Sequence, residues 1–138
     1  MTKADHDQTY VLGSSDAETR RLMSQADIYA PVTRRFFEDA GVAKGMKVLD
    51  VGTGAGDVAF IAADIVGPMG AVVGVDVNPE VLTTARSRAE DAHRDNVSFV
   101  EGDCLTAAIG DDFDAAIGRF VLMHAADAGE LLRAVKGR

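Results

Sequence analysis

The sequence VLDVGTGAGD, residues 48–57, decides the fold of this chain. An apolar strand, Val48–Val51, runs into three alternating glycines and then into a helical pattern of apolar residues that starts at Asp57. Glycine has no Cβ and tolerates positive φ, so a turn of this kind lets a ligand touch bare backbone. The free N–H groups of the following helix favour an electron-rich part of that ligand. Asp76 ends the next strand, at about the place expected for a ribose-binding carboxylate, roughly 20 residues further on. The stretch therefore predicts a site for a nucleoside-containing cofactor.

The composition limits the classes of function. With 138 residues the chain makes one domain. Its formal net charge of −8 argues against nucleic acid or an anionic membrane as a partner. The single cysteine, Cys104, excludes an internal disulfide, and the polar residues 1–8 do not resemble a signal peptide. The longest apolar runs, such as Phe120–Met123, are too short to span a bilayer. We therefore expect a cytoplasmic protein.

Strand-like and helix-like segments alternate along the chain. A capping box at Ser15–Glu18 predicts a helix through about Ala26, and Pro31 predicts the start of a second helix that ends near Gly41. The same kind of reading predicts strands at Val48–Val51, Ala71–Val77, Val97–Val100 and Phe113–Ile117, and helices at Asp57–Val66, from Pro79 onward and around Leu131–Val135. This alternation predicts an α/β fold with a parallel sheet, helices on both faces and right-handed crossovers.

Glycine or polar residues follow each of the four predicted strands. They are Gly52–Asp57, Asp76, Asp103 and Gly118-Arg119. In open parallel sheets, ligands bind at the carboxyl ends of the strands, near the switch point between the first strand and its two neighbours. We therefore expect these four strand ends to form one binding site.

The chain resembles the class I S-adenosylmethionine-dependent methyltransferases, close to the small-molecule enzymes of ubiquinone and menaquinone biosynthesis. The resemblance is carried by a Gly-x-Gly-x-Gly turn with Asp50 two residues before it, and by the pair Gly102-Asp103. A nicotinamide-binding turn would have its third glycine where this chain has Asp57, which disfavours a dehydrogenase. The resemblance covers nearly the whole chain, through Tyr10–Gly13, Val48–Gly56, Val73–Asp76, Val100–Asp103 and Phe113–His124.

The resemblance implies a role for most of the strand-end residues. The glycine turn would pass along the methionine and ribose portions of S-adenosyl-L-methionine, with Asp50 orienting the turn or reaching the methionine ammonium. Asp76 would accept both ribose hydroxyls, which a carboxylate does without needing a proton. Val77 would lie against the adenine face, Asp103 would bind the adenine amino group, and the backbone near Arg119 would bind the methionine amino group. The cofactor-binding residues predicted in this way are Asp50, Gly52, Thr53, Gly54, Gly56, Asp76, Val77, Asp103, Cys104, Arg119, Tyr10 and Gln25.

Some of these residues also have a plainer interpretation. Asp103 is a common type of turn cap. Cys104 is expected to be a small core residue, with only its backbone near the cofactor ring. His124 is the sole candidate for a general base, and a structural histidine is an equal alternative. The sequence contains no Cys/His cluster of the kind that binds a metal.

The resemblance also implies how the chain is organised. Residues 1–45 would form a helical lid that brings Tyr10 and Gln25 over the cofactor, and residues 46–138 would form the cofactor-binding domain. The sheet of the family has seven strands, whereas this chain supplies four, in the order 3-2-1-4. It is thus an incomplete Rossmann-like three-layer sandwich. Its fourth strand would be an exposed apolar edge, which predicts a homodimer through that edge.

The function that the resemblance implies is transfer of a methyl group to a small-molecule acceptor. The reaction is an in-line displacement in which the protein supplies alignment and excludes water. A non-catalytic cofactor-binding or partner module is the alternative, because the part of the fold that covers the acceptor is missing. A nicotinamide-dependent dehydrogenase fragment is a third alternative. The fold does not specify the acceptor.

Overall fold

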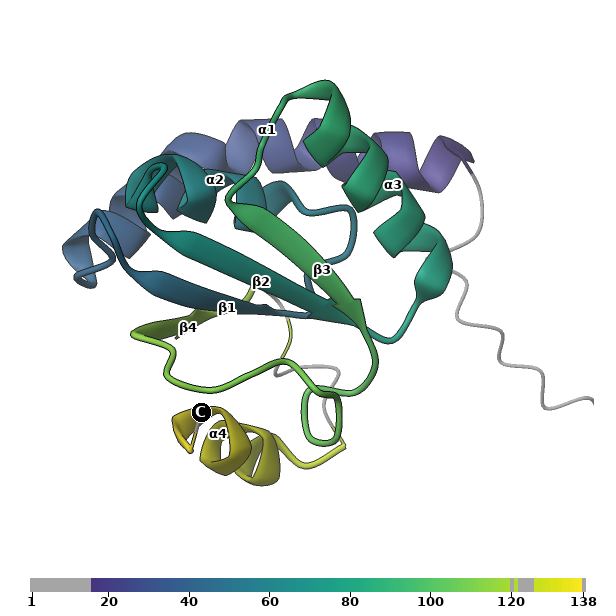
Figure 1. The fold of residues 1–138 in the computed structure, drawn as a ribbon. Coiled ribbons are helices and arrows are strands. Elements are labelled where there is room, and N and C mark those ends of the chain that lie inside the picture. The colour runs from purple at the N-terminus through teal and green to yellow at the C-terminus, as the bar shows by residue number, and fades with distance from the viewer. Residues whose placement is uncertain (1–15, 120, 122–125, 138) are drawn as a thin grey trace, which may run out of the picture.

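A computed structural model describes residues 16–119, 121 and 126–137. The elements follow one another as α1 (Asp16–Asp39), β1 (Lys47–Val51), α2 (Asp57–Val66), β2 (Ala71–Asp76), α3 (Pro79–Asp91), β3 (Val97–Glu101), β4 (Ala115–Ile117) and α4 (Ala128–Lys136). The strands of the described sheet are parallel and lie in the order β3-β2-β1-β4 (Figure 1). The predicted α/β fold and its strand order are confirmed.

The sheet lies between two layers of helices, with α1, α2 and α3 on one side and α4 on the other (Figure 1). Successive residues of a strand point to opposite faces of a sheet. Val48 and Val72 accordingly belong to the core on the side of α2. Leu49 and Val75 belong to the second core, against which Leu131 of α4 packs. Both faces of the central strands are therefore buried, as expected for a parallel sheet.

The N-terminal segment forms one helix, so the prediction of two helices divided at Pro31 was wrong. The helix α1 runs through this proline for 24 residues. A proline inside a helix removes one backbone hydrogen bond and crowds the carbonyl four residues earlier. The turns after it are held by Phe37, which is buried in the core beside α2. An ion pair between Arg34 and Glu38, with 3.1 Å between Nε and Oε1, adds support on the outer surface.

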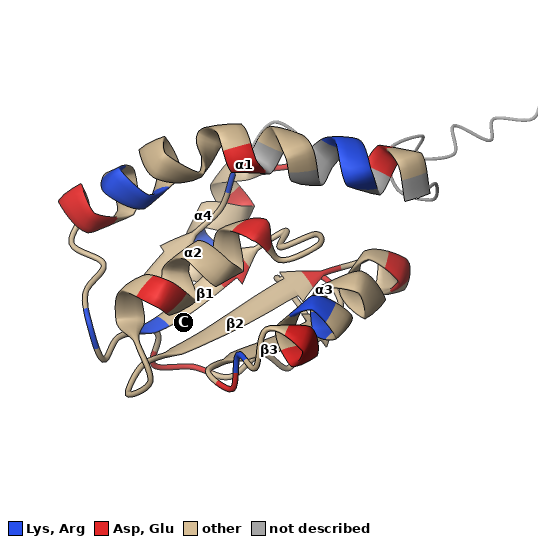
Figure 2. Ribbon diagram, turned by 90° about the horizontal axis from the view of Figure 1, so that it is seen from above, with Lys and Arg blue, Asp and Glu red and all other residues tan. Residues whose placement is uncertain are grey.

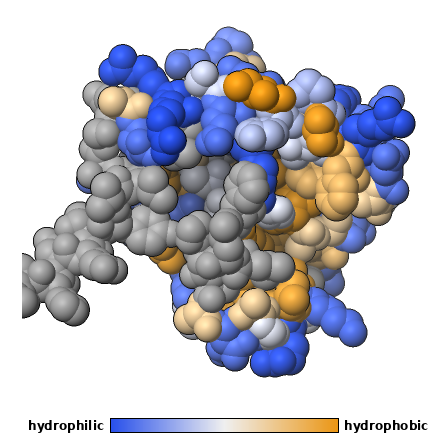
Figure 3. All heavy atoms as spheres, turned by 180° about the vertical axis from the view of Figure 1, so that it is seen from behind, coloured by the Kyte–Doolittle hydropathy of each residue, from blue (hydrophilic) through white to orange (hydrophobic). Residues whose placement is uncertain are grey.

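The helix α1 also carries an exposed apolar stripe. Ile28, Val32 and Phe36 follow one another at intervals of four residues, which places them on one helical face. Their exposed fractions are 74%, 71% and 68%. Seen from behind, orange apolar residues stand among the polar ones on this side of the molecule (Figure 3). The helix thus has more apolar surface than its contact with α2 covers.

Charged residues of both signs are interspersed along α1 and on the outer side of α3 (Figure 2). In this view Lys and Arg do not gather on one described helix without acidic neighbours, whereas nucleic-acid binding would favour such a basic cluster. None of the helices in the described ranges combines the length and the apolar character needed to cross a bilayer.

The strand β4 begins at Ala115, two residues later than predicted. Its predecessor Asp114 still bonds to β1, because its N–H donates to the Lys47 carbonyl oxygen at 2.8 Å. The side chain of Asp114 takes over the other half of this pairing: its Oδ2 accepts the Lys47 N–H at 2.8 Å. Phe113 lies under the Lys47 ammonium group, 4.4 Å from ring centroid to nitrogen. A side-chain bond therefore replaces the backbone ladder at this end of the strand.

Candidate cofactor site

The turn between β1 and α2 is open at Gly54, whereas Val121 lies beside Gly52, and Phe60 and Phe99 lie beside Gly56. Gly52, Gly54 and Gly56 have φ values of 66°, 56° and 89°, a region that residues with a Cβ rarely adopt. A Cβ placed on Gly54 would meet no atom within 4 Å, so the space beside this residue is open. Gly56 is the N-cap of α2 and has no side chain with which to bind the first N–H groups of that helix. A ligand can therefore approach the backbone at Gly54.

Asp76, at the end of β2, faces this turn. Its Oδ2 accepts the Gly54 N–H at 2.9 Å, and its Oδ1 accepts the Asn78 N–H at 2.9 Å. Asn78 in turn caps α3 through the Glu80 N–H. Each carboxylate oxygen can accept more than one hydrogen bond, so Asp76 keeps capacity for further donors. The carboxylate thus links the glycine turn to the start of α3 while it remains able to bind a ligand.

Asp50 lies beneath the turn and is 1% exposed. One of its oxygens accepts the Thr53 hydroxyl at 2.7 Å. Burial raises the pKa of this carboxyl from its ordinary 3.8 to about 7. The hydrogen bond from Thr53, the positive charge of Arg119 and a backbone bond from Ala59 lower the pKa by less, and the charge of Asp76 raises it further. The charge under the glycine turn therefore titrates close to neutral pH.

The side chain of Thr53 points into the protein and is 6% exposed. Its Oγ1 lies 2.6 Å from where a Cβ on Gly74 would stand, so only glycine fits at that position of β2. The Thr53 N–H donates to the Val75 carbonyl oxygen at 3.0 Å. The side chain thus holds Asp50 beneath the turn, and only the backbone of Thr53 lies in the turn itself.

The end of β3 lies beside Asp76, whose carbonyl oxygen accepts the Gly102 N–H at 2.9 Å. Asp103 acts as a turn cap, since its Oδ1 accepts the Leu105 N–H at 2.8 Å. This is the plainer role that its sequence context also allowed. Cys104 is buried in the second core, as expected from its residue type. The third strand end is therefore brought to the same rim as the first two.

Other predicted site residues are exposed or lie outside the described residues. Val77 follows Asp76 directly and is 68% exposed. Gln25 is an exposed residue of α1. Tyr10 and His124 lie outside the described residues. Their roles, and that of residues 1–45 as a lid, stay predictions.

Arg88 is a contributor to the site that the sequence did not reveal. This residue of α3 donates from Nη1 to the Ala55 carbonyl oxygen at 2.7 Å and to Oδ1 of Asp57 at 2.8 Å. Its guanidinium carbon also lies 5.0 Å from the centroid of the Phe60 ring. Arg88 thus ties the glycine turn to α3. The only signal in the sequence is the acid at Asp57, where a dinucleotide turn has glycine.

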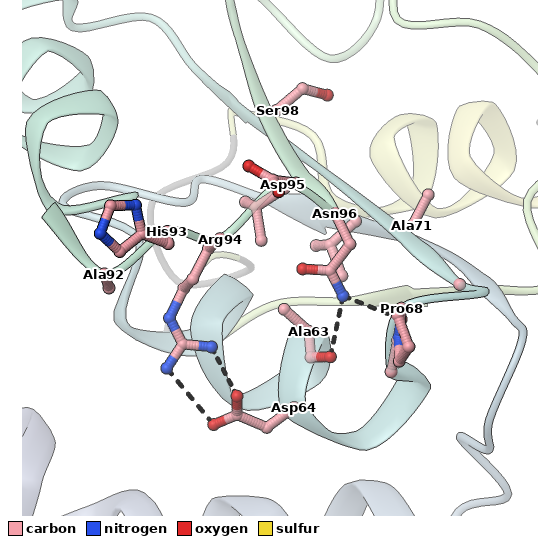
Figure 4. A pocket seen from close by; sticks show the side chains of 14 residues that line it. Ala63, Asp64, Pro68, Ala71, Ala92, His93, Arg94, Asp95, Asn96 and Ser98 are labelled. Carbon is pink, nitrogen blue, oxygen red and sulfur yellow. Dashed lines mark hydrogen bonds and ion pairs between the residues drawn. The ribbon is translucent and has the colours of Figure 1, made fainter. Parts of the chain in front are cut away.

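A hollow of about 730 Å³ lies at the end of the strands opposite to the glycine turn. It is lined by the segment after α3 and by the end of α2 (Figure 4). Arg94 forms an ion pair with Asp64 there, and Asn96 donates to the carbonyl oxygens of Ala63 and Gly67 at 3.0 and 2.9 Å. None of the predicted site residues lines this hollow, and Arg94 and Asn96 hold α2 there. Within the described ranges, no group of three His, Cys, Asp or Glu residues is placed to hold a metal ion.

The parallel sheet, the glycine turn and the acid at the end of β2 together define a Rossmann-like domain of the nucleotide-binding type. Residues 43–137 match a family model described as a methyltransferase domain. The chain therefore belongs to this family of methyltransferase domains. This confirms the family resemblance drawn from the sequence, and it favours a methyltransferase over a dehydrogenase.

Curated relatives agree with this family. The chain is 41% identical over 73 residues to an arsenite methyltransferase of Halobacterium salinarum, which covers 53% of this chain and 19% of the relative. It is 32% identical over 109 residues to the aklanonic acid methyltransferase DauC of a Streptomyces species, and this match covers 78% of this chain and 50% of the relative. It is 35% identical over 95 residues to demethylmenaquinone methyltransferase of Staphylococcus aureus, and this match covers 68% of this chain and 39% of the relative. The chain thus spans half or less of the length of these relatives.

Solved structures share the fold. A SAM-dependent methyltransferase from Aquifex aeolicus superposes with a TM-score of 0.71 at 25% identity, covering 76% of this chain and 56% of that one. The [4+2]-cyclase SpnF superposes with a TM-score of 0.69 at 23% identity, covering 78% of this chain and 40% of that one. The second likeness concerns the fold alone, and it illustrates that one fold serves different reactions.

Proposed function

We propose that this chain binds S-adenosyl-L-methionine at the rim formed by the glycine turn and Asp76, and serves the transfer of its methyl group to a small-molecule acceptor. Membership of the methyltransferase-domain family supports this function. The curated relatives are named for small acceptors such as arsenite, aklanonic acid and demethylmenaquinone. The observation that carries the proposal is the direction of the Asp76 carboxylate, which bonds to the Gly54 N–H at 2.9 Å instead of pointing into bulk water.

The residues at the rim suit a nucleoside with an amino-acid end. The open space beside Gly54 leaves room for a ligand to lie across the turn. The remaining lone pairs of Asp76 would accept the two ribose hydroxyls, which are donors. Asp50, buried under the same turn, would attract the methionine ammonium when it is ionised. The backbone of Gly52 and Gly56 would contact the methionine and ribose portions.

The adenine would lie toward the end of β3. Val77 is exposed and apolar, and its surface would cover one face of the ring. Asp103 uses Oδ1 to cap its own turn, so its other oxygen would accept the adenine amino group. The buried side chain of Cys104 leaves only its backbone for the ring edge. The backbone at Gly118-Arg119 would bind the methionine amino group.

Methyl transfer from this cofactor needs little acid or base catalysis by side chains of the protein. When bound, S-adenosyl-L-methionine supplies a methyl group that is already activated by the positive sulfur. The residues of this chain therefore hold the nucleoside, orient its amino-acid end and exclude water from the rim. A base is needed only for an acceptor that must lose a proton, and the candidate His124 lies outside the described residues.

Calorimetric titration with S-adenosyl-L-methionine, S-adenosylhomocysteine and NAD tests the binding half of the proposal. We expect the two adenosyl ligands to bind and NAD not to bind. Asp76→Ala should weaken binding by about 1–3 kcal/mol through the loss of charged hydrogen bonds. The control is Asp95→Ala, which removes an exposed carboxylate at the far hollow. Unchanged affinity in Asp76→Ala would mean that the ribose binds elsewhere.

Transfer of a labelled methyl group tests the catalytic half. The chain would be incubated with labelled S-adenosyl-L-methionine and a panel of arsenite, phenolic and quinone acceptors. Label in one of these acceptors would support the enzyme. Binding without transfer, with and without candidate partner proteins, would support the non-catalytic module instead.

We also propose that two copies of the chain associate along β4, in the cytoplasm. Within the described sheet β4 pairs with β1 alone and forms an edge. Unpaired backbone groups along such an edge favour addition of another strand. Static light scattering at micromolar concentration should report a dimer, and a monomer would contradict this part of the proposal.

A further inference from the structure

Two arginines, one in α3 and one just after it, lie against the same aromatic ring of α2. The guanidinium carbons of Arg88 and Arg94 are 5.0 and 5.2 Å from the centroid of the Phe60 ring. Each arginine also forms an ion pair with an acid of α2, and these acids are Asp57 and Asp64 respectively. The ring and the two acids stand three and four residues apart, so they share one face of the helix. Both arginines therefore hold α2 in a similar way.

Arg88 differs from Arg94 in one contact, which reaches beyond the helix. Its Nη1 donates to the Ala55 carbonyl oxygen in the glycine turn at 2.7 Å, and to Oδ1 of Asp57 at 2.8 Å. The bonds of Arg94 go to the carboxylate of Asp64 and to a backbone carbonyl oxygen, both within α2 (Figure 4). The side chains of Arg88 and Asp57 are 28% and 18% exposed, so water screens their bonds only in part. By sharing one nitrogen, Asp57 aims the guanidinium at the turn.

The bond from Arg88 holds the second half of the turn. The first half is held by two backbone N–H groups that donate to β2, at 3.0 and 2.9 Å. In the second half, the Gly56 N–H donates to the Thr53 carbonyl oxygen at 3.0 Å, which is a bond within the turn itself. Glycine has many accessible conformations, so a local bond alone constrains this half weakly. The bond to the Ala55 carbonyl oxygen adds a long-range link that keeps it in place.

We propose that Arg88, aimed by Asp57, is a positioning residue for the cofactor: it holds the second half of the glycine turn in the shape over which the sulfur-bearing part of the ligand lies. Arg88 acts through the Ala55 carbonyl oxygen and does not itself touch the ligand. The inference rests on the proposed function, in which the ligand lies across this turn. Loss of the arginine then weakens binding of the part beyond the ribose and spares binding of the adenosine part.

Two ligands and three variants test this role. S-adenosylhomocysteine extends across the turn, whereas adenosine ends at the ribose. Affinity for the first would be measured by calorimetry, and affinity for adenosine by its displacement of the first. The variants are Arg88→Met, Arg88→Lys and Arg94→Met. The last is the matched control, since Arg94 lies against the same Phe60 ring and pairs with α2 at a distance from the turn.

The inference predicts a loss that is specific to one variant and one ligand. Arg88→Met should weaken binding of S-adenosylhomocysteine about 5- to 30-fold, the effect of one or two lost hydrogen bonds of a charged group. Its affinity for adenosine should change by less than about threefold. Arg94→Met should also lower the midpoint of urea unfolding, yet both of its affinities should stay within about threefold of the wild type. Arg88→Lys should lie between Arg88→Met and the wild type, since an ammonium keeps the charge without the fork.

Other results would overturn the inference in distinguishable ways. Absence of binding by the wild type would refute the proposed function and the inference with it. Wild-type binding together with full affinity of Arg88→Met for S-adenosylhomocysteine would refute the inference alone. An equal loss for both ligands, or an equal loss in Arg94→Met, would make Arg88 a part of the general packing of α2. If adenosine binds too weakly to displace the longer ligand, the contrast between Arg88→Met and Arg94→Met decides.

Hydrogen exchange of the free wild-type chain gives a test that needs no substitution. The Gly56 N–H should exchange slowly before any ligand is added, because the turn that contains it is already held. Fast exchange of this amide would mean that the ligand, and not Arg88, orders the turn. That result would overturn the inference even if Arg88→Met does not fold.

Discussion

The replacement Asp50→Asn should make the folded chain less sensitive to pH. Asn has the same shape as Asp, keeps an oxygen that accepts the Thr53 hydroxyl, and does not titrate. In the wild type, burial raises the pKa of Asp50 from 3.8 to about 7. The folded protein therefore holds this proton to a higher pH than the unfolded chain does. Loss of the proton favours unfolding, so the wild type loses stability as the pH rises from about 4 to about 7.

The size of the effect follows from the two pKa values. Between pH 5 and pH 8 the wild type should lose about 2–3 kcal/mol of unfolding free energy relative to Asp50→Asn. Groups remote from Asp50 are the same in both proteins, so their contributions cancel in this difference. The measurement is urea-induced unfolding followed by circular dichroism at pH 5, 6, 7 and 8, with no cofactor present.

Asp95→Asn is the matched control, because Asp95 is exposed and the same change of charge occurs there in water. The pH dependence that Asp50→Asn shows beyond that of Asp95→Asn is the part that belongs to the burial of Asp50. Absence of this additional pH dependence would refute the reasoning, since Asp50 would then titrate alike in the folded and unfolded chains. A difference of the opposite sign would mean that ionised Asp50 is stabilised, with Arg119 outweighing the effect of burial.

Three further substitutions test how the site is held, each by urea unfolding. Gly74→Val should destabilise the fold by about 1–3 kcal/mol, because its Cβ would stand 2.6 Å from Oγ1 of Thr53. Gly137→Ala is the comparison without a clash, since φ there is −84° and the Cβ would stand 3.6 Å from the Ala134 carbonyl oxygen. Arg88→Met should cost about 1–2 kcal/mol and loosen the glycine turn, because its bonds at 2.7 and 2.8 Å are lost while its apolar stem is kept; an unchanged midpoint would show that the turn holds itself. Asn78→Ala should cost about 1 kcal/mol through loss of the cap of α3, and Asn78→Asp should restore most of that stability.

Much of the fold was predictable because its signals are local. The apolar run of β1, the glycines after it and the β-branched residues of β2 each report the conformation of their own segment. The alternation of strands and helices then leaves few topologies, since parallel strands need crossovers of one hand. Local signals failed where packing decided the outcome. Pro31 is a strong breaker by itself, yet α1 continues through it because Phe37 and its neighbours pack beside α2.

The site divides in the same way. The residue types at the strand ends were visible in the sequence, and the topology required that they share a rim. The sequence did not show which group each of these side chains would contact. Asp76 bonds to the turn, whereas Asp103 caps its own loop and Thr53 points inward to Asp50. These directions depend on contacts between segments far apart in the chain.

The sequence by itself determined the class of fold, the order of the four strands and the place where they end around a glycine turn. Only the tertiary structure decided that α3 holds this turn through Arg88, that Asp50 is buried deeply enough to titrate near neutral pH, and that one nitrogen of Arg119 is left unpaired beside it. The physical reason is that the conformation of a segment depends on its own residues, whereas hydrogen-bond partners, burial and charge depend on what the fold brings next to them.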